Sequence, residues 1–89
     1  MKQAKKITQS FKALQRLHDK YEEARKDLTR DVMQIAKDLP MSESEICRRV
    51  EMSRSAWAGY KETGLPFDRF AKIIEFFAGL RIDNKPVIL

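Results

Sequence analysis

The chain has 89 residues, 43% of them hydrophobic, and a formal net charge of +5. This length fits one domain, and a core this small is often marginal without a partner subunit. The single cysteine excludes an intramolecular disulfide and a cysteine-rich zinc site. No stretch has the apolar run of a secretory signal or of a membrane span, so we expect a cytoplasmic protein.

The positive charge is concentrated at the N-terminus. Residues 1–20 contain six basic residues and one acidic residue, so their net charge equals that of the whole chain. A basic end on a neutral body indicates a polyanionic partner, and nucleic acid fits better than a membrane surface. The alternative is a solvated helix face that only aids solubility.

Residues 3–39 contain neither proline nor glycine, and their hydrophobic residues have helical spacing. Two rows of positions, one starting at Ile7 and the other at Phe11, each repeat every seven residues, and the second row is polar at its middle, with His18 and Arg25. Together the rows alternate at intervals of three and four, which is typical of a coiled-coil seam and predicts pairing with a partner helix. The seam contains Ile7, Phe11, Leu14, Tyr21 and Leu28.

Two interpretations of this stretch are open. One is a continuous helix of about 35 residues that pairs with a second copy of the chain. The other, which we favour, is a break near Asp27–Thr29, with Thr29 as the cap of a separate helix that ends before Pro40. His18 lies in the same stretch, but no second His or Cys accompanies it, so we expect no metal site.

Residues 42–61 predict two short helices joined by a tight turn. Ser42 followed by Glu45 is a capping box that opens the first helix, and Ser53 is a suitable N-cap for the second, over residues 53–61. The apolar faces consist of Ile46, Cys47 and Val50 in the first helix and of Ala56, Trp57 and Tyr60 in the second.

The outer face of the second helix carries one long cation among very small side chains. It consists of Arg54, Ser55, Ala58 and Gly59. A helix with a bulky inner face and a nearly bare outer face can approach another surface closely. A long donor at its N-terminal end suits the major groove of DNA, where arginine pairs bidentately with guanine.

This pattern resembles the helix-turn-helix of the Cro and lambda-repressor-like (XRE-type) family. Cys47 stands where the family keeps a small residue, Met52 is the apolar residue of the turn, and Trp57 takes the branched aliphatic position of the recognition helix. Glu51 departs from the pattern, because it stands where the family favours a glycine in the left-handed conformation. With the flanking helices, the resemblance covers roughly Leu28–Leu80.

The resemblance implies a homodimeric, sequence-specific repressor of transcription that binds double-stranded DNA and is associated with the nucleoid. Such proteins are frequent regulators on phages and plasmids. On this interpretation Arg54 and Ser55 read base edges, while Ala58 and Gly59 permit close approach. DNA phosphates are contacted by Ser53, Lys61, Lys5, Lys6 and Lys12. No small-molecule effector is indicated.

Residues 62–66 contain Gly64 and Pro66 and predict a loop, followed by a fourth helix that stops at Gly79. A hydrophobic stripe on this helix is expected to close the core. The stripe consists of Phe67, Phe70, Ala71, Ile74, Phe77 and Ala78, widened by Ile73 and Phe76. The tail contains a turn at residues 84–86 and ends in Val87-Ile88-Leu89, which either packs onto the domain or contacts a partner subunit.

Together these patterns predict an all-α fold. A basic N-terminal helix (residues 1–28), long or bent, precedes a helix-turn-helix domain (residues 29–80) and a short tail (residues 81–89). No Gly-rich phosphate loop, metal-ligand set or nucleophile–base pair is evident, so we expect no enzyme, no metal and no cofactor. The alternative function is a helical protein-interaction module, adaptor or antitoxin-like, that uses the N-terminal helix as its partner-binding surface.

Overall fold

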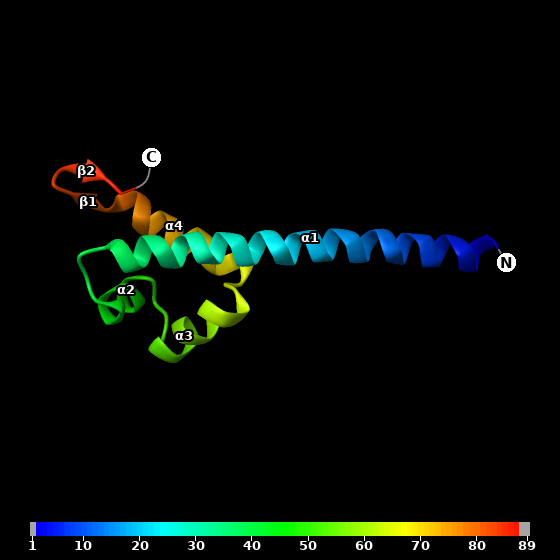
Figure 1. The fold of residues 1–89 in the computed structure, drawn as a ribbon, viewed down its shortest axis with the longest axis horizontal. Coiled ribbons are helices and arrows are strands. Elements are labelled where there is room, and N and C mark those ends of the chain that lie inside the picture. The colour runs from blue at the N-terminus through cyan, green and yellow to red at the C-terminus, as the bar shows by residue number, and fades with distance from the viewer. Residues whose placement is uncertain (1, 88–89) are drawn as a thin grey trace.

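The computed structural model describes residues 2–87 of the chain. Its elements are α1 (Lys2–Asp38), α2 (Glu43–Arg49), α3 (Arg54–Thr63), α4 (Phe67–Gly79), β1 (Arg81–Ile82) and β2 (Lys85–Pro86) (Figure 1). The predicted all-α fold with a long N-terminal helix is confirmed, since the two strands have only two residues each. Within residues 2–87, no helix has an apolar run long enough to cross a lipid bilayer.

α1 is one uninterrupted helix of 37 residues, so the predicted break near Asp27–Thr29 is wrong. Thr29 does not cap a second helix. Its hydroxyl group donates a hydrogen bond to the carbonyl oxygen of Arg25, four residues earlier, at 2.8 Å. The helix ends at Asp38, as predicted from the proline that follows two residues later.

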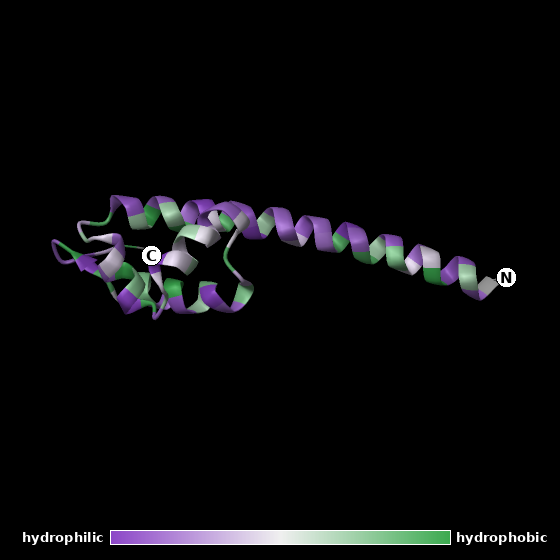
Figure 2. Ribbon diagram, turned by 90° about the horizontal axis from the view of Figure 1, so that it is seen from below, coloured by the Kyte–Doolittle hydropathy of each residue, from purple (hydrophilic) through white to green (hydrophobic). Residues whose placement is uncertain are grey.

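The N-terminal half of α1 projects away from the other elements (Figure 1), and the longest axis of the molecule extends 65 Å. Every residue from 3 to 21 is exposed. Hydrophobic positions recur along this projecting half between hydrophilic ones (Figure 2). We call residues 2–20 the arm. Because the arm packs against no other element, its hydrophobic side chains remain in water.

The core lies where the C-terminal half of α1 packs against α2, α3 and α4. The largest fully buried side chains include Trp57, Phe77, Ile46, Leu65 and Ile73. The predicted inner faces of α2 and α3 are thereby confirmed. The predicted stripe of α4 is partly wrong: Phe70, Ile73 and Phe77 form its buried face, whereas Phe67 is 74% exposed and Ile74 is 40% exposed. A helix buries only one narrow face against its neighbour, and the stripe was wider than that face.

β1 and β2 form a short antiparallel hairpin. The register pairs Arg81 with Pro86 and Ile82 with Lys85. The turn is made by Asp83 and Asn84 in left-handed conformations, with φ of 52° and 67°, so the predicted turn at residues 84–86 is displaced along the chain. Val87 packs against the core, which is one of the two predicted alternatives for the tail. Residues 88–89 lie outside the described part of the chain.

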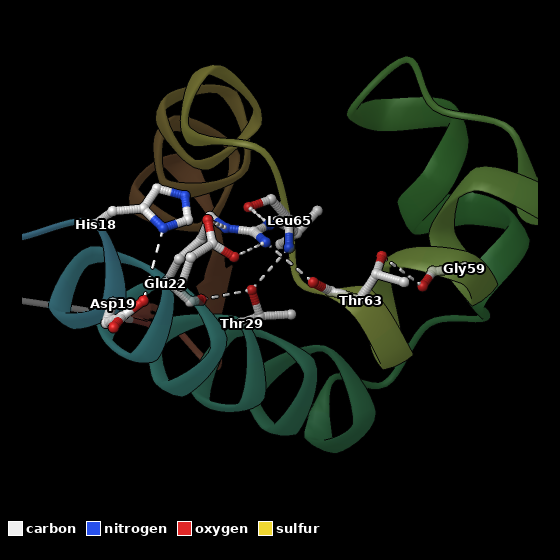
Figure 3. Close-up of polar contacts among 8 residues, drawn as sticks. His18, Asp19, Glu22, Thr29, Gly59, Thr63 and Leu65 are labelled. Atoms are coloured by element: carbon white, nitrogen blue, oxygen red, sulfur yellow. Dashed lines mark hydrogen bonds and ion pairs between the residues drawn. The ribbon is translucent and has the colours of Figure 1, made fainter. Parts of the chain in front are cut away.

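Polar contacts tie the loop after α3 to the middle of α1 (Figure 3). The Thr29 side chain is buried, and its Oγ1 accepts a hydrogen bond from the backbone N–H of Leu65 at 2.8 Å. The guanidinium group of Arg25 donates to the carbonyl oxygens of Leu65 at 2.9 Å and Thr63 at 3.1 Å. On its other side this group pairs with Glu22 at 2.7 Å, a contact that lowers the pKa of Glu22. Side chains of α1 therefore hold the end of α3 and the start of α4 against α1.

Replacing Thr29 with valine should lower the free energy of unfolding by about 1–3 kcal/mol, measured by urea denaturation. Valine keeps the shape of the side chain but leaves the buried N–H of Leu65 without an acceptor. Thr8→Val is the matched control, because the Thr8 hydroxyl donates to the carbonyl oxygen of Ala4 at 3.0 Å on an exposed surface. Its effect should stay within about 0.5 kcal/mol. Equal stabilities of the two variants would contradict a structural role for the Thr29–Leu65 hydrogen bond.

Candidate nucleic-acid interface

Both predicted N-caps are present, each at the start of one helix of the α2–α3 pair. In α2, the Ser42 hydroxyl oxygen accepts a hydrogen bond from the N–H of Glu45 at 3.2 Å. In α3, the Ser53 hydroxyl oxygen accepts one from the N–H of Ala56 at 3.0 Å. Each serine supplies an acceptor for a backbone N–H that has no partner within the helix, so each helix begins directly after its serine. The Glu45 carboxylate pairs with arginines one turn further along α2.

The turn between α2 and α3 is closed by a hydrogen bond from the N–H of Met52 to the carbonyl oxygen of Cys47, at 2.8 Å. Glu51 has a φ of 55°, so it adopts the left-handed conformation in the position where the family pattern has glycine. This conformation costs a non-glycine residue about 1–2 kcal/mol. The Glu51 carboxylate forms an ion pair with Lys72 of α4, and this hydrogen-bonded contact lowers the pKa of Glu51. The turn therefore keeps its geometry with glutamate in place of glycine.

The outer face of α3 is exposed along its length. Arg54, Ser55, Ala58 and Gly59 all face solvent, whereas Trp57 on the inner face is buried. A Cβ atom added to Gly59 would meet no atom within 4 Å, so packing within the described chain does not require glycine there. The bare surface leaves room for a ligand to approach the backbone of α3.

α3 is longer than predicted. It ends at Thr63 rather than Lys61, so Glu62 and Thr63 belong to its last turn and not to the following loop. The Thr63 hydroxyl donates to the carbonyl oxygen of Gly59 at 3.1 Å, within the same helix. Glu62 comes four residues after Ala58 and so stands on the same outer face. This face is therefore basic at its N-terminal end and acidic at its C-terminal end.

One carboxylate connects the two basic residues of α3 that were predicted to contact DNA. Glu43, at the start of α2, forms an ion pair with Arg54 at 3.2 Å and, through its other oxygen, with Lys61. Arg54 also donates to the Ser44 hydroxyl oxygen at 2.6 Å. The hydrogen bond from Lys61 is the main cause of the lowered pKa of Glu43, and the charges of Lys61 and Arg54 lower it further. Both cations remain accessible to an external anion, with 57% of the Arg54 side chain and 40% of the Lys61 side chain exposed.

Further basic residues, which the helix-turn-helix pattern does not include, lie beside Lys61. Arg30 and Lys37 of α1 line the same groove as Trp57, Glu43 and Lys61. Lys26 lines an adjoining groove that also includes Arg30 and Lys61. The signal was present in the sequence, because Lys26, Arg30 and Lys37 are four and seven residues apart and share one helix face. α1 thus adds three cations to the edge of α3.

The remaining predicted phosphate contacts lie far from α3. Lys5, Lys6 and Lys12 are exposed on the arm, and no ion pair found within residues 2–87 involves them. Lys12 and Lys26 are separated by roughly 20 Å along the helix axis. The predicted seam is also exposed: the exposed fraction is 41–69% for Ile7, Phe11, Leu14, Tyr21 and Leu28. One chain therefore does not bring the arm and the outer face of α3 together.

Comparisons with family models, with curated proteins and with solved structures found no match to this chain. The functional argument therefore depends on the chain's own residues and on their geometry.

Glu43→Gln should raise the affinity for double-stranded DNA several-fold at low salt, because Arg54 and Lys61 are then free of the carboxylate that competes with phosphate for them. Fluorescence anisotropy with a labelled duplex measures the change. Glu51→Gln is the control: it removes one negative charge as well, but its partner is Lys72 of α4. Equal gains in the two variants would show that only net charge matters and that Glu43 has no special relation to the interface.

Proposed function

We propose that this chain is a sequence-specific, double-stranded-DNA-binding transcriptional regulator that acts as a homodimeric repressor in the cytoplasm, on the nucleoid. The observation that carries the proposal is the outer face of α3. It is an exposed helix surface with a long cation in its first turn and small side chains behind it. It follows a tight turn in which Glu51 adopts the left-handed backbone conformation, and its inner face is anchored by the buried Trp57.

In the proposed complex α3 enters the major groove. Arg54 pairs with a guanine, Ser55 contacts a neighbouring base edge, and Ala58 and Gly59 let the helix come close to the bases. The Arg54 guanidinium group must first leave its ion pair with Glu43 before it can contact DNA. An exposed ion pair of this kind contributes at most about 1 kcal/mol, so its loss is easily offset by a bidentate contact to guanine.

Phosphate contacts position the protein on the duplex without reading its sequence. Lys61 is suited to this role together with the cap residue Ser53, since both lie beside the outer face of α3. Arg30 and Lys37 extend the same basic edge onto α1. The arm lysines at positions 5, 6 and 12 would contact phosphates further away or in the half-site of the other subunit. These contacts predict a steep dependence of affinity on salt concentration.

The second candidate function is a helical interaction module, adaptor or antitoxin-like, in which the arm binds another protein. The observation that favours it is the exposed hydrophobic row of the arm, from Ile7 to Leu17. The two functions differ in what they require of α3. An adaptor has no use for Arg54 among small neighbours on an open helix face, whereas a DNA reader does.

Arg54→Ala should weaken binding to the preferred DNA site by about 1–3 kcal/mol and relax the preference at one base pair, measured by selection from a random duplex library followed by anisotropy. The thermal midpoint should change little, because the side chain is exposed. Arg48→Ala is the matched control, an exposed arginine of α2 paired with Glu45. If Arg54→Ala keeps the parent site preference, Arg54 does not read bases.

Changing Lys5, Lys6 and Lys12 together to glutamine should weaken DNA binding and reduce the slope of log K against log salt by about 0.9 for each phosphate that the arm no longer neutralises. All apolar residues of the arm are retained, and sedimentation equilibrium of the variant verifies that it has the same oligomeric state as the parent at the concentration used. The control removes three charges elsewhere, by changing Lys72, Arg81 and Lys85 to glutamine. An unchanged affinity and salt slope in the arm variant would assign the arm lysines to solubility alone.

A further inference from the structure

α1 carries one apolar stripe along its whole length, but the domain covers only its C-terminal half. At 100° per residue, Val32 and Ala36 lie on the same face as Ile7, Phe11 and Leu14. Val32 and Ala36 are buried in the core. The same stripe is open to solvent further towards the N-terminus, where its members are between 41% and 69% exposed. They are Ile7, Phe11, Leu14, Leu17, Tyr21 and Leu28.

The open stripe leads directly into an apolar groove between α1 and α4. Tyr21, Ala24 and Leu28 of α1 form one wall, and Phe67, Phe70 and Ile74 of α4 form the other. Tyr21 and Leu28 belong both to the stripe and to the groove. The charged residues of its lining are Arg25 and Asp68. Phe67 is the most exposed large hydrophobic residue of the chain's described part, at 74%.

We propose that the arm of a second copy of the chain fills this α1–α4 groove, running antiparallel to α1, and that each subunit does so to the other. The inference deepens the homodimer of the proposed function by naming the surface and the direction of pairing. The arm of a second copy offers an apolar stripe of the same length and width as the one that it would cover.

Charge selects the antiparallel direction. The arm carries six basic residues and one acidic one within residues 1–20, so parallel pairing would set two strongly basic helices side by side. Antiparallel pairing instead brings the basic tip of each arm to residues 22–31 of the other subunit. That segment contains four acidic residues, Glu22, Glu23, Asp27 and Asp31, against three basic ones, so its net charge is −1 where that of residues 1–20 is +5. Glu22 and Asp27 also pair with Arg25 and Arg30 of their own helix, and Asp68 lies at the adjoining groove.

The spacing of the stripe sets the register. In an antiparallel pair the seam positions of both helices meet when facing residue numbers add up to 32, which places the two-fold axis near residue 16. The facing pairs are then Ala4 with Leu28, Ile7 with Arg25, Phe11 with Tyr21 and Leu14 with His18, so two of the four pairs set an apolar side chain against a polar one. A shift of seven residues one way would leave Leu28 and the groove empty. The opposite shift would set Ile7 against Val32, which the core already buries.

Spin-label distances test the direction and register of pairing. Lys5→Cys and Gln9→Cys are each made in a Cys47→Ala background, because Cys47 is the only cysteine. In the proposed pair, residue 5 faces residue 27 and residue 9 faces residue 23. The expected distances between labels are therefore about 35 Å and about 23 Å, from a rise of 1.5 Å per residue and a helix separation of about 10 Å. Two short and equal distances would show parallel pairing, and no dipolar signal at about 100 µM protein would show no pairing. Either result would overturn the proposal.

A matched pair of isoleucine variants tests the groove itself. Ile74 lines the groove and is 40% exposed, whereas Ile82 lies in the hairpin at the other end of α1 and is 37% exposed. Ile74→Ser should raise the dissociation constant of the dimer at least about tenfold in sedimentation equilibrium, since apolar burial is reduced in two symmetric grooves. Ile82→Ser should leave it unchanged. Equal dissociation constants for Ile74→Ser and the parent would exclude the groove as the docking site.

Both measurements use the protein without DNA, and circular dichroism of each variant verifies that the monomer fold is intact. A chain that pairs as proposed but binds no duplex would refute the DNA-binding function and leave the pairing standing. A chain that binds its DNA site without these distances would refute the pairing alone.

Discussion

The hydrogen bonds that Thr29 and Arg25 make to the loop after α3 hold the helices of the domain in place. Thr29 accepts from the backbone N–H of Leu65, and Arg25 donates to the carbonyl oxygens of Thr63 and Leu65. The last turn of α3 cannot move relative to α1 without breaking these bonds. α4 begins two residues after Leu65, so its position depends on them as well. These bonds to the middle of α1 therefore contribute to the direction in which the outer face of α3 points.

The uninterrupted course of α1 serves both the core and the arm. A helix of about 20 residues in water is marginal on its own, because nucleation is unfavourable and tertiary packing is absent. The arm avoids separate nucleation, since it continues a helix that the core already stabilises at Val32 and Ala36. The exposed hydrophobic row of the arm remains a cost for the single chain, and burial against a second copy in the proposed dimer would remove it. In that dimer, the continuity of the helix would link folding of the domain to assembly.

Local sequence chemistry determined most of the helices and both faces of α3. The caps at Ser42 and Ser53 follow from side-chain oxygens placed next to free backbone donors, and the end of α1 follows from Pro40. The burial of Trp57 and the exposure of Arg54 follow from the 3.6-residue period of a helix. These features involve residues within about one turn of each other, so no knowledge of packing was needed to predict them.

Only the tertiary structure decided the features that join residues far apart in the chain. The local sequence allows Thr29 either to cap a helix or to lie within one. In the structure it lies within α1, and its hydroxyl oxygen accepts a hydrogen bond from the N–H of Leu65, 36 residues later. The helical spacing in α4 is compatible with a wide hydrophobic stripe. Packing of α4 against the core buries only the part of that stripe formed by Phe70, Ile73 and Phe77. The sequence indicated that Arg54 and Lys61 are the basic residues of α3, but it did not predict that both pair with Glu43. That carboxylate reaches them only when α2 packs against α3. Contacts of this kind depend on how the helices are oriented in space, and that orientation is set by the sum of the core contacts rather than by any local pattern.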